Sequence, residues 1–382
     1  MTGAPRTAAG RIAGFDLARA IAIFGMVTVN FRVVLADSDG PEWLERLADQ
    51  IDGRAAALFV FLAGLGISLL SAHSRASGEA AAIRADRLTL LKRALFLFII
   101  GLAFRRIWEF DILHFYGVYL FLAALVLTVS NRMLIALGVV AAAIFPALYL
   151  VLPAQFGIPF WDTTAALTAR DIAIDVFFQG YHPLFPWLAF LFAGMIIGRL
   201  DVGDRHIRRL MLWGGIALAL AAEAIAFALL GIGLLKTLLN IAPAIAIEPV
   251  ADNFGTEPYP PMPLFVAVGI GWAMAVSSLC LSAGERWNGK VWLTPFIHAG
   301  QLALTVYIVH GSIAIWALDW IGLGGQHSTA WTLGYAVLFY AVIVLLATLW
   351  RRRFARGPIE TVMRRLTGSR KSEILPEGVA AA

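Results

Sequence analysis

Long apolar segments, separated by short polar stretches, repeat along the whole chain. A helix of about 20 apolar residues crosses the roughly 30 Å hydrocarbon layer of a membrane. Ten segments fit this pattern or come close to it: 14–35, 55–72, 88–104, 112–129, 133–152, 184–200, 208–232, 263–283, 297–318 and 331–350. The pattern predicts an all-α, polytopic integral membrane helical bundle of about ten transmembrane helices. We expect one transmembrane domain, 1–367, and a disordered cytoplasmic tail, 368–382.

The distribution of Lys and Arg predicts how the bundle is oriented. If the N-terminus is cytoplasmic, 22 of the 30 Lys and Arg residues fall in the inner loops and tail, and 7 fall in the outer loops. Positive charge concentrates on the cytoplasmic side of membrane proteins, so both termini are expected inside. The three long loops, 36–54, 153–183 and 233–262, then lie outside, on the face where binding is expected.

Composition supports a membrane protein and excludes several other classes. The chain is 60% hydrophobic and 14% charged, with a mean hydropathy of +0.79, which indicates a multi-pass protein in the lipid bilayer. We expect that bilayer to be the cytoplasmic membrane. The basic residues lie beside apolar segments, so topology explains them better than nucleic-acid binding does. The single Cys280 allows no disulfide framework, and we expect no metal site and no bound cofactor.

The first apolar segment contains a stripe of polar residues. Asp16 and Arg19 are three residues apart and share one helix face, so they can pair. Asn30 lies eleven residues beyond Arg19, on the same stripe and about 16 Å further along the helix. A polar stripe in a spanning helix must face protein or water. It either lines a substrate-binding site or forms a structural ion pair that locks the bundle.

Two outer histidines are candidates for acid–base chemistry. His114 follows Asp111 by three residues, so a carboxylate could orient its imidazole as a general base. Alternatively, Asp111 is a helix N-cap. His182 lies at the entry to the segment 184–200, where it could instead be an interfacial residue beside the aromatic Trp187.

Arg105 and Arg106 lie on the outer side, against the charge trend. Guanidinium groups bind carboxylates and phosphates well, so the pair could form a clamp for an anion or a carbonyl in the substrate. The alternative is local pairing with the acidic residues that follow, Glu109 and Asp111.

Stretches spread over the whole chain resemble one bacterial membrane family. They are 11–30, 52–66, 111–116, 300–307 and 356–367. Together they resemble YeiB-like membrane proteins, a family similar to heparan-alpha-glucosaminide N-acetyltransferase and to bacterial O-acyltransferases that modify cell-surface sugars. The resemblance implies a helical bundle that moves an acyl group from a cytoplasmic donor, with acyl-CoA as the co-substrate, to an extracytoplasmic sugar or small metabolite.

One position departs from these relatives. The O-acyltransferases carry a His where this chain has Asn30, and an amide cannot act as a base at neutral pH. The heparan-type relatives place a His in the first outer loop, and the loop 36–54 has none. Another outer histidine must then serve, His182 or His114. We favour His182, because the stretch 181–187 also resembles a proline–tryptophan motif of the heparan-type relatives.

A second hypothesis is a transporter or export partner for a small metabolite, without acyl-transfer chemistry. In that case Asp16, Arg19 and Glu223, the lone acid of the segment 208–232, would couple to substrate or protons. Such transporters often show inverted repeats, and the sequence shows no clear repeat.

Overall fold

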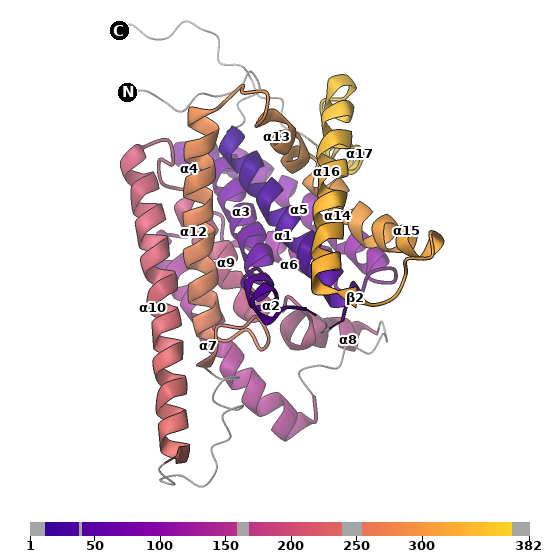
Figure 1. Ribbon diagram of the computed structural model, residues 1–382. Coiled ribbons are helices and arrows are strands. Elements are labelled where there is room, and N and C mark those ends of the chain that lie inside the picture. The colour runs from indigo at the N-terminus through magenta and orange to yellow at the C-terminus, as the bar shows by residue number, and fades with distance from the viewer. Residues whose placement is uncertain (1–11, 38–39, 159–167, 239–253, 369–382) are drawn as a thin grey trace, which may run out of the picture.

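The computed structural model describes residues 12–37, 40–158, 168–238 and 254–368, and its helices run side by side as a bundle (Figure 1). The expected tail therefore lies almost entirely outside the described residues. The long helices are α1 (Ala13–Leu35), α3 (Arg54–Leu70), α5 (Ala80–Phe104), α6 (Leu113–Leu125), α7 (Asn131–Phe156), α9 (Leu184–Ile197), α10 (Arg205–Leu238), α12 (Pro263–Arg286) and α16 (Thr329–Arg353).

Shorter elements connect these helices or extend them. They are α2 (Glu42–Asp49), α4 (Ala72–Ser77), α8 (Ala169–Ile174), the π-helix η1 (Asp175–Gln179), α13 (Thr294–Gln301), α14 (Ala303–Val309), the π-helix η2 (His310–Ala314), α15 (Ile315–Trp320) and α17 (Pro358–Thr367). Two short strands, β1 (Ala36–Asp37) and β2 (His327–Ser328), pair in parallel. The predicted fold class, an all-α membrane bundle, is confirmed.

The number of spans is lower than the predicted ten. Among the described residues, six helices are long and apolar enough to cross a membrane, or eight if two bent helix pairs each count as one span. All ten predicted segments are mainly helical, but α6 has only 13 residues. α5 does not count as a span, because every 18-residue stretch of this helix contains at least three charged residues, Arg87, Lys92 and Arg93. Apolar runs alone therefore overcount the full spans.

The two bent spans are broken at defined places. The segment 169–179 meets α9 at 62°, and α13 meets the helical segment 303–318 at 73°. At the second break, Glu360 of α17 accepts hydrogen bonds from the backbone N–H of Thr305 (3.0 Å) and from its hydroxyl (2.5 Å). A helix that begins inside a bundle leaves N–H groups without partners, and Glu360 satisfies one of them. Gln301, beside the break, donates to Asp16 of α1 (3.0 Å).

The ends of the elements sort into two faces of the bundle (Figure 1). The start of α1 lies near α4, α13 and α17 at one end, and α2, α8 and β2 lie toward the other. We call these the inner and outer ends, following the charge-based orientation, which stays a prediction. The strand pair joins the segment after α1 to the segment before α16 at the outer end, with Ala36 opposite His327.

Candidate functional site

A cavity of about 180 Å³ lies in the outer half of the bundle, between α1, the start of α3 and the segments around 110–112, 181–182 and 259. Its walls are mostly apolar, and a few polar groups converge on it. These are Asn30, Asp52, Tyr181, His182, Tyr259 and Tyr307. We call this the outer cavity. Burial raises the pKa of the Tyr259 hydroxyl above its usual value, so this phenol stays protonated at neutral pH and can donate a hydrogen bond.

The chain places Asp52 at the cavity through a tight turn. Gly53 adopts a left-handed backbone (φ 68°), and a side chain there would meet Pro258 and Phe265. Only glycine fits both the backbone and the space. Arg32, which follows Asn30 on α1, donates to Asp52 (3.0 Å) and to Asp49 (2.7 Å), so the carboxylate is held at the rim of the cavity.

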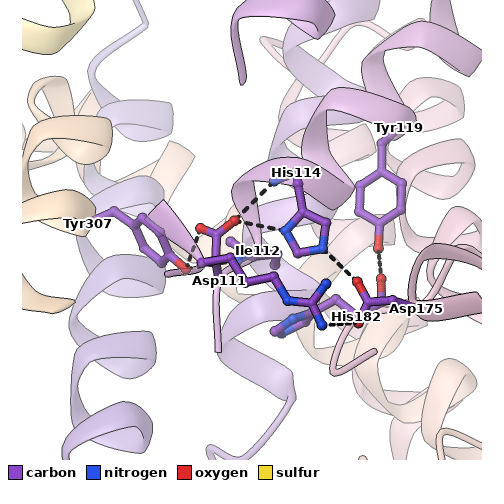
Figure 2. Close-up of polar contacts among 8 residues, drawn as sticks. Asp111, Ile112, His114, Tyr119, Asp175, His182 and Tyr307 are labelled. Atoms are coloured by element: carbon purple, nitrogen blue, oxygen red, sulfur yellow. Dashed lines mark hydrogen bonds and ion pairs between the residues drawn. The ribbon is translucent and has the colours of Figure 1, made fainter. Parts of the chain in front are cut away.

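His182 lines the outer cavity from the connection between η1 and α9. Its backbone carbonyl accepts a hydrogen bond from Tyr119 (2.6 Å; Figure 2). Its ring packs edge-on against Trp187, with 4.6 Å between the ring centroids. Within the described part of the chain, the buried Nδ1 atom of His182 has no hydrogen-bond partner. Packing therefore orients the ring and leaves a ring nitrogen for chemistry.

His114 is bound differently from His182. Its Nδ1 atom lies 2.9 Å from Asp111 and its Nε2 atom lies 2.9 Å from Asp175, while Arg105 donates to Asp175 (3.1 Å; Figure 2). A carboxylate can only accept, so both ring nitrogens donate and the ring is an imidazolium. Asp111 also accepts from the backbone N–H of His114 (3.1 Å), while Ile112 is the N-cap residue of α6, so Asp111 pairs with the imidazole from one position before the cap. In this arrangement His114 has no lone pair for a substrate and joins α6 to η1.

His310 is a buried residue that sequence reasoning did not select. Its Nδ1–H donates to the carbonyl of Tyr307, which leaves Nε2 to accept from the Asn30 amide at 2.8 Å. This contact fixes the amide of Asn30, so that its Nδ2 points to His310 and its Oδ1 is left for a ligand. The signal that could have identified it is its position three residues after Tyr307, the last residue of the resembling stretch 300–307.

One of the two paired charges of α1, Arg19, lines a second cavity. Asp16 is buried and accepts from Arg19 (2.7 Å) and Gln301 (3.0 Å), so the predicted pair is present. Arg19, one-third exposed, lines a cavity of about 260 Å³ together with Arg93 and apolar side chains. We call this the inner cavity. Arg19 and Asn30 therefore line different cavities along one helix.

The predicted outer arginine clamp does not form around the outer cavity. Arg105 is bound to Asp175 in the network described above, and Arg106 is exposed; neither side chain lines the outer cavity. Glu223, proposed as a relay, pairs with Arg54 (3.0 Å) and accepts from Thr256 (2.9 Å).

A pair of aromatic rings lines the inner cavity near the outer one. On α3, Ala56 lines the outer cavity and Phe59 lines the inner cavity. In the same way, Ile112, one residue before α6, lines the outer cavity, and Tyr116 of α6 lines the inner cavity. These positions are three to four residues apart, about one helical turn or 6 Å. The rings of Phe59 and Tyr116 contact each other at 5.3 Å. Both rings line the inner cavity about one helical turn from the outer cavity, and we call them the partition rings.

The fold and these cavities define an integral membrane helical bundle. It has a mostly apolar cavity with a few converging polar groups in its outer half, and an apolar cavity with two arginines in its inner half. A family model described as "Heparan-alpha-glucosaminide N-acetyltransferase, catalytic" matches residues 11–218, more than half of the chain, so the chain belongs to that family. A second model, "Protein of unknown function (DUF418)", matches residues 198–370 and corresponds to the YeiB-like resemblance. No curated protein matches the chain.

The two matched regions both contribute to the outer cavity. The first contains Asn30, Asp52 and His182, and the second contains Tyr259 and Tyr307.

Among the described residues, no group of three His, Cys, Asp or Glu side chains is placed to hold a metal ion.

Proposed function

We propose that this protein is an acyltransferase of the cytoplasmic membrane, which moves an acyl group from a cytoplasmic donor to an acceptor in the outer cavity. The observation that carries the proposal is the environment of His182. Its ring lines the outer cavity, as Asn30 and Asp52 do, and its buried Nδ1 atom has no hydrogen-bond partner among the described residues. A neutral imidazole with an unpaired ring nitrogen can accept a proton, which is the task of a general base.

In the proposed reaction the donor is an acyl-CoA thioester. His182 removes a proton from an acceptor amine or hydroxyl, and the acceptor atom forms a bond to the acyl carbon. The C–S bond breaks, and the thiolate of CoA leaves and takes up the proton from the imidazolium. Asn30, held by His310, positions the acceptor through its Oδ1 atom.

The inner cavity supports a donor that enters from the cytoplasm. Arg19 and Arg93 line it together with apolar residues that include Leu90 and Met363. Guanidinium groups pair with phosphates, and the apolar walls suit the pantetheine arm and an acyl group. The partition rings, Phe59 and Tyr116, would have to move for the acyl group to reach the outer cavity.

The outer cavity suits a small polar acceptor. Its volume of about 180 Å³ is below the roughly 300–1,000 Å³ that is usual for drug-sized ligands. The phenols of Tyr181 and Tyr259 can pack on a sugar face, and Asp52 can accept hydrogen bonds from a hydroxyl or an ammonium group. The family name refers to a glucosaminide acceptor, so we propose an amino sugar here too.

The test is to purify the protein and measure release of CoA from acetyl-CoA in the presence of glucosamine. We expect His182→Ala to lower kcat by about 10²- to 10⁴-fold, the usual contribution of a general base. His327→Ala is the matched control, because His327 lies toward the same end of the bundle and does not line the cavity. A folded His182→Ala variant with wild-type turnover would refute the assignment.

The transporter hypothesis keeps one supporting observation. Bent and broken spans are common in transporters, and the described residues contain two bent helix pairs of this kind. The same preparation separates the hypotheses when it is reconstituted in vesicles. Movement of acetylated or free amino sugar across the membrane without any release of CoA would favour transport.

A further inference from the structure

A third cavity, of about 430 Å³, lies at the inner end between α10 and α12. Its lining follows one face of each helix, with spacings of three and four residues. The lining residues are Arg205, Arg208, Arg209 and Leu212 on α10, and Ser278, Ser282, Glu285 and Arg286 on α12. We call this the basic cavity. It shares no lining residue with the inner or the outer cavity.

The basic cavity contains a built, partly buried cationic centre. The Arg208 side chain is only 6% exposed; it donates to Glu285 and to the carbonyl of Gly203 (3.1 Å). Ser278 donates to the backbone carbonyl of Arg208 (2.6 Å). Arg208 is therefore fixed in place before any ligand arrives.

The positive charge in this cavity exceeds the negative charge. Four guanidinium groups line it against the single carboxylate of Glu285. That carboxylate forms an ion pair with Arg208 and lies 3.7 Å from the guanidinium group of Arg205. Arg209 and Arg286 form no ion pair with any described residue. Like charges held together repel each other, and an anion with several oxygens would relieve that repulsion.

The surroundings of the cavity favour a lipid over a soluble anion. Leu210, Trp213 and Leu279, on the same turns of the two helices, are exposed and apolar, as side chains that contact acyl chains are. Arg286 lies over the ring of Trp287 (5.9 Å), an aromatic residue of the kind found at the membrane interface. Basic pockets between helices at the cytoplasmic face bind anionic headgroups.

We propose that the basic cavity binds the phosphate headgroup of an anionic phospholipid from the inner leaflet. The lipid would bridge α10 and α12 and thereby hold α10, which packs mainly on α12, to the bundle. This site is independent of acyl transfer, and it does not require the proposed enzyme activity.

The test uses native mass spectrometry of the full-length protein with added phosphatidylglycerol or phosphatidylcholine. We expect preferential retention of phosphatidylglycerol, and at least tenfold weaker binding in the Arg205→Gln/Arg209→Gln/Arg286→Gln variant. The matched control is the variant Arg352→Gln/Arg353→Gln/Arg365→Gln, which removes three exposed arginines elsewhere at the inner end. This control should bind phosphatidylglycerol as tightly as the wild type does.

Equal retention of phosphatidylglycerol by the triple variant would overturn the proposal. So would displacement of the lipid by inorganic phosphate at a concentration similar to that of the lipid, because the site would then be one for a free anion. If the triple variant does not fold, Arg209→Gln alone is used. Arg209 is exposed and unpaired among the described residues, and its loss should still weaken phosphatidylglycerol binding several-fold.

Discussion

Replacing His114 by alanine should destabilise the protein rather than remove its base. The ring is 1% exposed and lies 2.9 Å from each of two carboxylates, those of Asp111 and Asp175. Without the imidazolium, these two acids face a buried gap, and only Arg105 remains to balance them. The variant therefore leaves a buried negative charge without its partner.

The size of the effect follows from these contacts. Breaking a buried ion pair by removing one partner costs about 3–5 kcal/mol. Two hydrogen bonds to charged groups, each worth about 1.5–3 kcal/mol, give a similar total. We therefore expect His114→Ala to lower the free energy of unfolding by about 3–5 kcal/mol. In an Asp175→Asn background the same change should cost about 1–3 kcal/mol less, because less charge is left unpaired.

Equilibrium unfolding in mixed detergent micelles, followed by tryptophan fluorescence, measures this difference. His182→Ala is the comparison, because no hydrogen bond is known for its buried Nδ1 atom and the predicted loss is in turnover. If the free energy of unfolding of His114→Ala lies within about 1 kcal/mol of the wild-type value, the His114 ring does not form a buried ionic link between Asp111 and Asp175.

Three further outcomes are expected. Arg19→Ala should reduce the yield of folded protein, measured by size-exclusion chromatography, because it leaves the buried Asp16 with one partner fewer; the exposed Arg106→Ala is the control, and equal yields would contradict the pairing. Phe59→Ala should open the partition and speed transfer of acyl groups longer than acetyl relative to acetyl in a CoA-release assay, whereas an unchanged preference would place the acyl path elsewhere. Reporter fusions at positions 45 and 170 should read periplasmic and those at 80 and 365 cytoplasmic, and a cytoplasmic signal at 170 would reject the orientation.

The sequence predicted the fold class because lipid imposes a simple rule on composition. Each of the ten predicted apolar segments is mainly helical in the structure. The sequence could not predict which of these segments are too short or too charged to span the membrane, or where a span bends. The position of a bend depends on tertiary partners. The backbone N–H of Thr305 is satisfied by Glu360, a residue of another element, and no local pattern shows this.

In the candidate site too, contacts between residues close in sequence were predicted and contacts between distant residues were not. Pairs three residues apart, Asp16 with Arg19 and Asp111 with His114, are present because helix geometry alone brings them together. Partners distant in sequence were missed. Asp175 occupies the second nitrogen of His114, and His310 accepts from the Asn30 amide, and both contacts depend on how the helices pack.

The most direct test of the central claim is a sided transfer assay in oriented vesicles. Acetyl-CoA with a labelled acetyl group is supplied on the cytoplasmic face, and glucosamine is supplied on the opposite face. The account predicts labelled N-acetylglucosamine on the acceptor side with the wild type and with His327→Ala, and almost none with His182→Ala. Label that stays with CoA on the donor side in the wild type, or equal product from His182→Ala, would contradict it.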